Sequence, residues 1–550
     1  MSGPRNATTR DASMWKLSTQ MATLKEERSS LVLKIGGIDQ KLSELRAEYG
    51  AIYNASSSLL NLPAEITCMI FDYATATATG THPEYNDLDT EPAPETAEGR
   101  RLRSEVVITH VCKRWREIAL NYPRLWSRFF YWEEDMSGDG ISLQRFAAYL
   151  DRSGTQSLEL VLEFNDSFAG PRTNPVEEDD RLAMLDLALT HVARWKIFIL
   201  RADFSLPVIG RIRSLTSATA PNLEYFAFSP DVSGQKSHFV DATDLIDAPD
   251  IQPTLFTGGA PKLDYVHLDG SGCVLPPLSN ITTLRIEAED CLSLLFTWPA
   301  MLEIFAIPTL TNLSIVGNVF HPPLAFEGLP LITMSSLKHL RYSDNDFLTL
   351  LLPYLRLPVL ESLSLRNIWV PEEFGTTVPT PPPTSSKPGY FFPSLTTVTL
   401  IDSTASTIAA ARYFMHLTKR TQTLLLSVDE PDENILAVLL PYSPHKECWP
   451  KLSTLIANLN SEDEIEFVIE LAVSRPKKAL RLKMFEELER AWRMEEPEQF
   501  ARLEAACTLD TLGNEDQEML KPVWPPGGRY PGYSNNDDPF EVDTDYPSRF

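Results

Sequence analysis

The sequence lacks paired cysteines, an excess of basic residues and any apolar run long enough to cross a membrane. Its six cysteines are scattered over 550 residues and never form a C-x-x-C pair, a pattern typical of reduced core thiols and not of a disulfide framework. The formal net charge of −26 argues against a nucleic-acid binder, which usually carries a basic field. The longest apolar stretch, Cys291 to Leu302, has 12 residues, so we expect no membrane-spanning helix. The first residues carry charge without an apolar core and do not resemble a secretory signal, which makes the cytoplasm or the nucleus the expected location.

Catalytic motifs are missing as well. The chain contains no G-x-G-x-x-G, no P-loop and no G-x-S-x-G sequence. His110 with Cys112, and His445 with Cys448, could each supply two metal ligands. A structural zinc site needs four ligands, and neither pair has a second pair at the usual spacing. We therefore expect a protein without catalytic residues, metal or cofactor.

The chain is too long for one compact core, so two or more folding units are expected. Hydrophobic residues make up 43% of the sequence and charged residues 23%, as in ordinary soluble globular proteins.

Apolar residues recur every seven positions near the N-terminus. A second series lies four residues after each member of the first, with Arg28 in a position that would weaken packing or specify a partner. This 3.5-residue period predicts a coiled-coil-like helix within residues 1–57. It either associates with a second helix, through self-association or partner docking, or folds back on the chain. Gly36 and Gly37 together cost roughly 2 kcal/mol of helix propensity and could allow a kink. The first series is Leu17, Leu24, Leu31, Ile38, Leu45 and Ile52, and the second is Met21, Arg28, Ile35, Leu42 and Tyr49.

Two short helices are expected next. Pro63 suits the first turn of a helix, where its missing N–H is not needed, and an apolar face follows it through Ile70. A second helix is expected over Val107 to Ala119, ending before Pro123. The apolar pair Leu125-Trp126 lies beyond that end.

The residues of this segment resemble the F-box family. The blocks L-P-x-E-I-x-x-x-I-F from Leu62, V-C-K-R-W-R-x-I-A from Val111 and P-x-L-W from Pro123 follow the F-box pattern. They are most similar to fungal F-box proteins in which a heptad helix comes directly before the first block. The resemblance covers Leu62 to Trp126, and it implies a small helical unit, 58–132, that binds the Skp adaptor of cullin-based ubiquitin ligases. It implies these adaptor-contacting or adaptor-supporting residues: Leu62, Pro63, Ile66, Ile70, Val111, Cys112, Trp115, Leu125 and Trp126.

One feature departs from that pattern. Residues 75–104 are rich in Pro, Thr and Glu and separate the two helices, so a disordered insertion is predicted here. Long surface loops add little closure entropy, and adaptor binding could survive the insertion.

The middle of the chain repeats the pattern apolar-x-x-apolar-x-apolar. The middle residues lie 18 to 40 positions apart, mostly 23 to 31, and the leucine-rich repeat has this pattern with a period of roughly 20–29. At the ninth position, nine of ten copies carry a polar residue and only Ile368 does not, which suits the place where a strand bends away. The middle residues are Phe226, Val266, Leu284, Leu313, Leu340, Leu363 and Val398, with looser copies at Phe198, Leu424 and Leu455.

The sequence therefore predicts an α/β chain whose residues 133–460 form an irregular leucine-rich-repeat-like horseshoe with a parallel concave sheet. A strand over Leu158 to Phe164 and a helix near residues 180–193 would join it to the helical unit. Residues 461–510 are expected to form a helical cap, and 511–550 a disordered acidic tail.

Residues that flank each middle residue point to the opposite side of a strand, so they should be exposed on the concave face. Aromatic and Arg side chains dominate interface energetics, which makes some of them candidate contacts for an unknown protein substrate, although each could also be an ordinary solvated strand residue. The candidates are Tyr225, Tyr265, His267, Arg285, His339 and Arg341. The expected partners are thus a Skp-type adaptor and a protein substrate, with a non-ligase scaffold as the alternative function.

Overall fold

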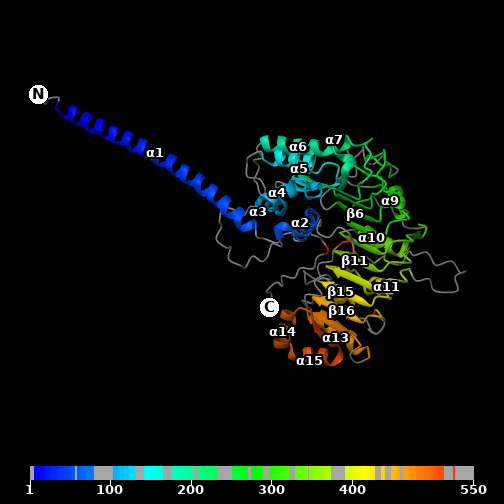
Figure 1. Ribbon diagram of the computed structural model, residues 1–550. Helices are drawn as coiled ribbons and strands as arrows, with labels where there is room; N and C mark the ends of the chain where they lie inside the picture. Colours follow the sequence, from blue (N-terminus) through cyan, green and yellow to red (C-terminus); the bar gives the residue numbers. More distant parts are fainter. Residues whose placement is uncertain are drawn as a thin grey trace. The chain divides into compact units, whose positions relative to one another are not determined.

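The structure, a computed structural model, describes most of the chain (Figure 1). The chain forms two compact units. The described residues are 5–55, 59–79, 103–131, 141–164, 175–203, 208–231, 251–269, 274–288, 296–320, 329–344, 346–372, 374, 391–427, 435–439, 448–458, 462–476, 479–512, 524–526 and 540. The first unit comprises Met1–Thr75 and Leu102–Asn121, and the second comprises Ala76–Arg101 and Tyr122–Phe550. The chain is a mixed α/β protein with a long N-terminal helix and a large, open parallel sheet.

The first unit begins with helix α1, Arg5–Ala55, whose 51 residues run without a break. Gly36 and Gly37 lie inside it, and a Cβ at either position would meet no atom within 4 Å. Because i→i−4 hydrogen bonds need only backbone atoms, two glycines weaken the helix without ending it. Among the described residues, no helix is both long and apolar enough to span a membrane.

Three shorter helices complete the first unit: α2 (Ala64–Thr79), α3 (Ser104–Val111) and α4 (Lys113–Leu120), with a 3-10 turn, η1 (Leu59–Asn61), before them. The expectation of one helix over Val107 to Ala119 is wrong, because the chain is extended at Cys112 (φ −159, ψ 167). The Cys112 Sγ accepts a hydrogen bond from the N–H of Trp115 at 3.4 Å. Cys112 is therefore the N-cap of α4, and it separates two helices where one was expected.

The second unit is built on a sheet of 14 strands formed by the described residues, all parallel and ordered along the chain. Consecutive strands of this sheet are neighbours throughout, and two small strand pairs lie outside it, so the parallel sheet expected from the repeats is confirmed. The strands are β1 (Arg128–Tyr131), β2 (Leu158–Phe164), β3 (Trp195–Asp203), β4 (Tyr225–Asp231), β5 (Tyr265–Asp269), β6 (Thr283–Ala288), β7 (Asn312–Gly317), β9 (His339–Ser343), β11 (Ser362–Arg366), β13 (Thr397–Ile401), β15 (Thr423–Ser427), β16 (Thr454–Asn458), β17 (Arg481–Met484) and β18 (Thr508–Thr511). The small pairs are β8 (Ile332–Thr333) with β10 (Leu355–Arg356), and β12 (Trp369–Val370) with β14 (Thr404–Ala405).

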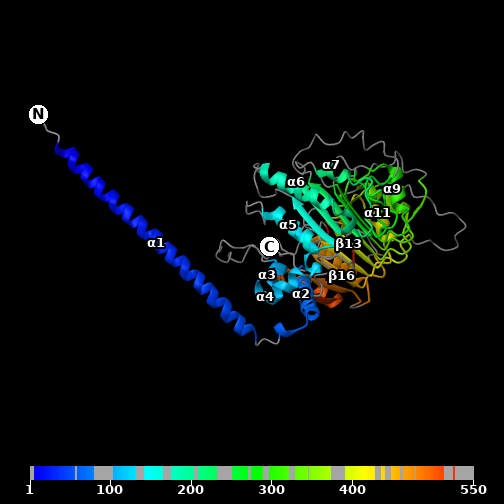
Figure 2. The ribbon, with the colours of Figure 1, turned by 45° about the horizontal axis from the view of Figure 1, so that its top comes forward.

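Helices connect these strands and lie along one side of the sheet, which Figure 2 shows for α6, α7, α9 and α11. We call this side the helix-covered face and the other the opposite face. The connecting helices and 3-10 turns are η2 (Pro123–Trp126), α5 (Ile141–Arg152), α6 (Pro175–Leu189), η4 (Val192–Arg194), α7 (Val208–Arg213), α9 (Trp298–Phe305), α10 (Asp346–Leu351), η5 (Leu352–Tyr354), α11 (Ile408–Leu417), α12 (Ile435–Leu439), α13 (Glu462–Val473), α14 (Glu486–Glu495) and α15 (Pro497–Ala506).

The middle residues of the repeats form the core of the helix-covered face. They lie in one row because neighbouring strands pair in register: Leu340 pairs with Leu363, which pairs with Val398. At the N-terminal end of the sheet this row continues as stacked rings, with Trp195 and Phe198 centred 3.9 Å apart. All five residues are fully or almost fully buried, so the repeated apolar pattern supplies a continuous core.

Three neighbouring strands, β9, β11 and β13, are each followed by an Asp or Asn residue in the left-handed backbone region. Asp344, Asn367 and Asp402 have φ values of 54, 48 and 46, and each backbone N–H donates to the last residue of the next strand. Asp and Asn tolerate this backbone region better than other side-chain-bearing residues. The polar bend expected at the ninth position of the repeat is thus made at the eighth in these strands.

Three expected boundaries differ from the structure. The sheet begins at β1 and continues through β17 and β18, so it extends past both ends of residues 133–460, and the 461–510 segment contributes strands as well as helices. Helix α2 runs to Thr79, into the expected 75–104 insertion, whose residues 80–102 lie outside the described residues. Trp524 and Phe540 are buried, which corrects the expectation of an entirely disordered tail; residues 513–523, 527–539 and 541–550 lie outside the described residues.

Candidate interaction surfaces

The short helices of the first unit surround a very small core. Phe71 is fully buried and meets Trp115 edge to face, with ring centroids 5.2 Å apart. Ile108 and Thr67 are also buried, and the Thr67 hydroxyl donates to the Pro63 carbonyl. The ring contact joins α2 to α4.

The Arg114 side chain connects the motif block that begins at Leu62 to the block that begins at Val111. The Arg114 guanidinium donates to the Leu62 carbonyl at 2.7 Å, across 52 positions of sequence. Arg116 donates to the Thr109 carbonyl at 2.8 Å and links α4 to α3. Arg114 and Arg116 therefore connect α4 to Leu62, which precedes α2, and to α3 through backbone carbonyls.

Five large apolar side chains of α2 and α3 remain exposed. We call them together the helical patch: Ile66, Met69, Tyr73, Val107 and Val111, exposed at 42, 65, 74, 40 and 52%. Single exposed apolar residues are normal on a protein surface, but several on so small a unit indicate an interaction site.

The structure distributes the nine expected adaptor residues over three environments. Pro63, Ile66 and Val111 are exposed. Those that are half-buried against the core are Leu62, Ile70, Cys112 and Trp115. The remaining two, Leu125 and Trp126, belong to the second unit.

Leu125 and Trp126 lie in η2, directly before the first strand of the sheet. Trp126 is 2% exposed; its ring meets Tyr149 of α5 at 5.0 Å, and the Arg152 guanidinium lies 4.6 Å from the ring centroid. The P-x-L-W block therefore packs against α5 and next to the first strand of the sheet.

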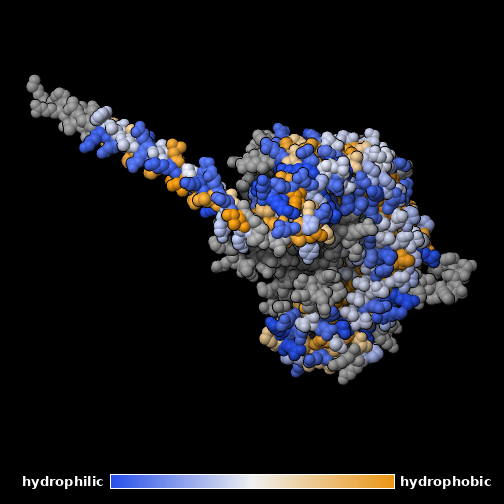
Figure 3. All heavy atoms as spheres, viewed as in Figure 1, coloured by the Kyte–Doolittle hydropathy of each residue, from blue (hydrophilic) through white to orange (hydrophobic). Residues whose placement is uncertain are grey.

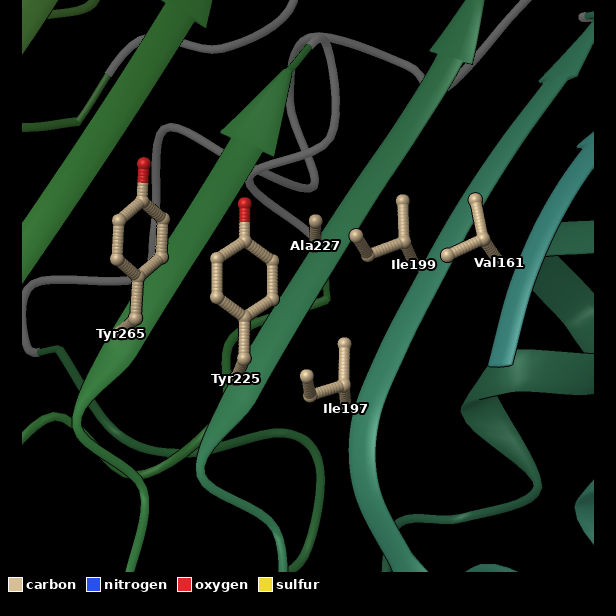
Figure 4. Close-up of a cluster of buried hydrophobic side chains, with 6 residues drawn as sticks. All are labelled: Val161, Ile197, Ile199, Tyr225, Ala227 and Tyr265. Atoms are coloured by element: carbon tan, nitrogen blue, oxygen red, sulfur yellow. The ribbon is translucent and has the colours of Figure 1, made fainter. Parts of the chain in front are cut away.

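The opposite face of the sheet is apolar near its N-terminal strands. Figure 4 shows the cluster formed there by Val161, Ile197, Ile199, Tyr225, Ala227 and Tyr265. Tyr225 and Tyr265 stack across neighbouring strands, with centroids 4.2 Å apart. Burial is the main reason why the pKa of each phenol is raised above its ordinary value. Their expected exposure is wrong: Tyr225 and Tyr265 are 3 and 5% exposed, and both rings belong to this buried cluster.

A charged cluster follows on strands β5 and β6. His267 Nε2 lies 2.8 Å from a Glu287 carboxylate oxygen, and Arg285 contacts the other oxygen. Burial raises the pKa of Glu287, but the charges of Arg285 and His267 outweigh it and hold that pKa below its usual range. Burial lowers the pKa of His267, with Arg285 adding to the effect and Glu287 opposing it. His267 and Arg285 are buried in this cluster, which is also contrary to their expected exposure.

Arg341, on strand β9, is buried beneath two aromatic rings from the C-terminal part of the chain. Its guanidinium carbon lies 4.3 Å from the centroid of the Trp524 ring and 4.7 Å from that of Phe540. Its Nε donates to the Ser314 hydroxyl at 2.8 Å. The expected exposure of Arg341 is wrong because these rings lie over it.

The sixth candidate, His339, is half-buried, and its Nδ1 lies 2.7 Å from the Ser362 hydroxyl. Burial lowers its pKa, with Lys338 adding to the effect and Glu361 opposing it. The same rows continue from strand β11 to β16 as half-buried hydroxyl groups, which we call the hydroxyl strip: Ser362, Ser364, Thr397, Thr399, Thr423 and Thr454.

Sequence reasoning missed the hydroxyl strip and the two C-terminal rings. The strip occupies the same flanking positions as Tyr225 and could have been found by following those positions through every repeat. Nothing in the repeat pattern indicates that Trp524 or Phe540 reaches strand β9, since their partner lies far away in the sequence.

Helix α1 presents a third surface. Every side chain from Met14 to Tyr49 is exposed, including the apolar heptad positions (Figure 3). The described part of α1 thus has an apolar seam without a covering layer, while Arg28 lies within that seam.

No protein-family model and no curated protein matches this chain.

Proposed function

We propose that this protein is the substrate-recognition subunit of a cullin-based ubiquitin ligase. In this proposal the helical unit is an F-box that binds a Skp-type adaptor, and the sheet unit is a leucine-rich-repeat-like solenoid that binds a target protein. Both partners belong to the cytoplasm or the nucleus.

The helical patch is the observation that carries the adaptor half of the proposal. Ile66 and Val111 belong to the residues for which the F-box resemblance implies adaptor contact, and both are exposed. Phe71 and Ile108, from the same helices, are buried. A unit with so little core gains stability when a partner covers its remaining apolar surface.

The strand order supports the substrate half. Each expected repeat contributes one strand, strands pair in chain order, and three of them end in the same left-handed Asp or Asn. Stacking of one supersecondary unit on the next is the arrangement of solenoid repeats, whose long faces bind proteins.

The proposed mechanism is proximity. A target held on the sheet unit, with the helical unit bound to the adaptor, experiences a raised effective concentration of the ubiquitin-charged enzyme. The chain itself supplies no catalytic group in this mechanism.

The test is binding of the purified full chain to a purified Skp adaptor, measured by biolayer interferometry. Ile66→Asp should weaken binding at least about tenfold, because burial of an Ile side chain is worth about 1.5–3 kcal/mol and about 1.4 kcal/mol is a factor of ten. Leu62→Ala with Pro63→Ala should abolish binding while the sheet stays folded. Met494→Asp on α14, where the side chain is 78% exposed, is the matched control and should bind as the wild type does. Absence of binding by the intact chain would refute the proposal.

The alternative is a protein-interaction scaffold that never joins a ligase. The exposed seam of α1 favours it, because the F-box function does not require a 51-residue helix. An intact chain that fails to bind the adaptor but associates through α1 would support the scaffold.

A further inference from the structure

Two rings from the C-terminal part of the chain close on one cation of the sheet. Arg341, Trp524 and Phe540 are 1, 7 and 1% exposed, and the rings lie within 5 Å of the guanidinium carbon. We call Trp524–Pro526 together with Phe540 the C-terminal clasp.

The clasp lies on the opposite face of the sheet, where residues flanking the middle apolar position gather. Arg341 is paired in register with Ser314 on one side and Ser364 on the other. Ser364 belongs to the hydroxyl strip. Arg285 of the charged cluster lies one strand beyond Ser314 in the same row. The clasp thus sits between the charged cluster and the hydroxyl strip.

The clasp contacts Arg341 through side chains and not through backbone groups. Strand β9 is an interior strand that pairs with β7 and β11, so its backbone groups serve the sheet. A buried guanidinium has lost hydration, and aromatic faces replace part of that loss by cation–π attraction. A segment held in this way can exchange for another that brings rings to the same cation, and the sheet need not open.

We propose that the surface around Arg341 is a peptide-binding site and that the clasp is its internal ligand. A partner enters by displacing the clasp with an extended segment that carries two aromatic side chains. Residues 524–550 contain the acidic Asp537, Asp538, Glu541, Asp543 and Asp545 against Arg529 and Arg549. The favoured partner is therefore an acidic, aromatic-bearing segment of a protein. This deepens the proposed function, on which it rests for treating the displacing partner as a ligase target.

The first experiment compares two forms of the chain with a fluorescent peptide of residues 521–545. The peptide should bind a chain that ends at Val523, and should bind the intact chain at least about tenfold more weakly, because a tethered ligand acts at millimolar effective concentration. Arg341→Ala in the shortened chain should abolish binding. A peptide with Trp524→Ala and Phe540→Ala should not bind.

A second variant guards against failure of the shortened chain to fold. The full-length chain with Trp524→Ala and Phe540→Ala should bind the wild-type peptide as the shortened chain does. Full-length Trp369→Ala, which removes an exposed ring elsewhere on the sheet unit, is the control and should bind the peptide as weakly as the intact chain does. Equal peptide binding by the intact and clasp-free chains, or unchanged binding after Arg341→Ala, would overturn the proposal. Adaptor binding is measured separately, so its failure would refute the ligase function and leave this site untouched.

The exposed seam of α1 carries a second, independent inference. The period places Leu17, Leu24, Leu31, Ile38, Leu45 and Ile52 at position d and Met14, Met21, Arg28, Ile35, Leu42 and Tyr49 at position a. The charged flanking residues are then Glu27, Lys34, Lys41 and Glu48 at g, and Lys25, Asp39 and Arg46 at e.

These charges distinguish the two orientations of a second copy. A parallel pair sets Lys34 against Asp39 but also Lys41 against Arg46, and it puts the two Arg28 side chains in one layer of the seam. An antiparallel pair that aligns every a with a d sets Lys25 against Asp39 and Glu27 against Lys41, each twice, with one unfavourable contact between the Lys34 residues. We propose that α1 associates with a second copy of this chain in the antiparallel orientation, since charges at e and g set orientation.

Analytical ultracentrifugation of a charge-swap series tests this. In the antiparallel pair Lys25→Glu should weaken the dimer several-fold, because it places Glu against Asp39 twice, and Lys25→Glu with Asp39→Lys should restore it. In a parallel pair Lys25 faces Gln20, so Lys25→Glu would have little effect, and Asp39→Lys would weaken the dimer without rescue. That parallel pattern, or a wild-type chain that stays monomeric, would overturn the inference.

Discussion

The charged cluster of strands β5 and β6 allows a sharp prediction for Glu287→Gln. The carboxylate contacts both His267 and Arg285, and the three side chains are 13, 7 and 5% exposed. Removal of one partner from a buried ion pair costs about 3–5 kcal/mol. Solvent screening is small at these exposures, so we expect Glu287→Gln to lower the free energy of unfolding by about that amount.

The pH dependence follows from the direction of each shift. The pKa of Glu287 is lowered from its ordinary 4.5, so its contribution to stability is present above pH 4.5 and is lost as the pH falls through the window below it. The pKa of His267 is lowered from 6.5, so the unfolded chain binds the extra proton and stability falls as the pH drops below 6.5. Glu287→Gln should abolish the first loss and enlarge the second, because Glu287 no longer raises the pKa of His267.

Urea unfolding over the range from about pH 2 to about pH 8, followed by circular dichroism, measures both effects, because the Glu287 window lies below pH 4.5 and the His267 window below pH 6.5. Glu361→Gln is the matched control, because Glu361 pairs with Lys338 at 49 and 50% exposure, and surface pairs contribute about 0–1 kcal/mol. Arg285→Met with Glu287→Gln should be less destabilised than the sum of the single variants, since neighbours in one ion pair couple. A Glu287→Gln chain within about 0.5 kcal/mol of the wild type, as for an ordinary surface substitution, would refute the reasoning.

Three further predictions concern the other parts of the chain. Gly36→Ala with Gly37→Ala should stabilise helix α1 by roughly 2 kcal/mol, because neither new Cβ meets an atom within 4 Å; thermal melting by circular dichroism would show it, and an unchanged melt would contradict it. Phe71→Ala should cost roughly 3–5 kcal/mol and should abolish hydrogen-exchange protection in α2, α3 and α4 while strands β5 to β7 keep theirs; loss in both units would contradict the division of the chain. Asp344→Val should destabilise the sheet unit by roughly 1–2 kcal/mol more than Asp344→Gly does, because φ is positive there and both variants lose the same carboxylate contacts with Ser343 and Asn367; equal urea midpoints for the two variants would argue against strain at this bend.

The parallel sheet could be predicted from the sequence because each repeat places one apolar residue in the row that includes Leu340, Leu363 and Val398. Burial of that row depends only on neighbouring strands, so a local pattern is sufficient. Strands β1, β17 and β18 lacked the leading leucine of the pattern, and their place in the sheet follows from pairing with a neighbour instead.

The exposure of the opposite face could not be predicted in the same way. Alternation places Tyr225 and Arg341 on that face, but it does not say what else lies there. Tyr225 is buried by Tyr265 of the adjacent strand, and Arg341 by rings more than 180 positions later in the sequence. Contacts of the second kind leave no periodic trace.

The P-x-L-W block lies directly after the boundary between the two units. Trp126 carries the end of the F-box resemblance, yet its ring packs against Tyr149 and beneath Arg152 of α5. Burial of the Trp126 side chain against α5 contributes several kcal/mol to the sheet unit, since Trp→Ala in a core costs about 3–5 kcal/mol. The same residues therefore end one motif and begin the fold of the other unit. For this reason a boundary drawn after residue 132 cuts through the packing of η2, β1 and α5, whereas one drawn at Asn121 does not.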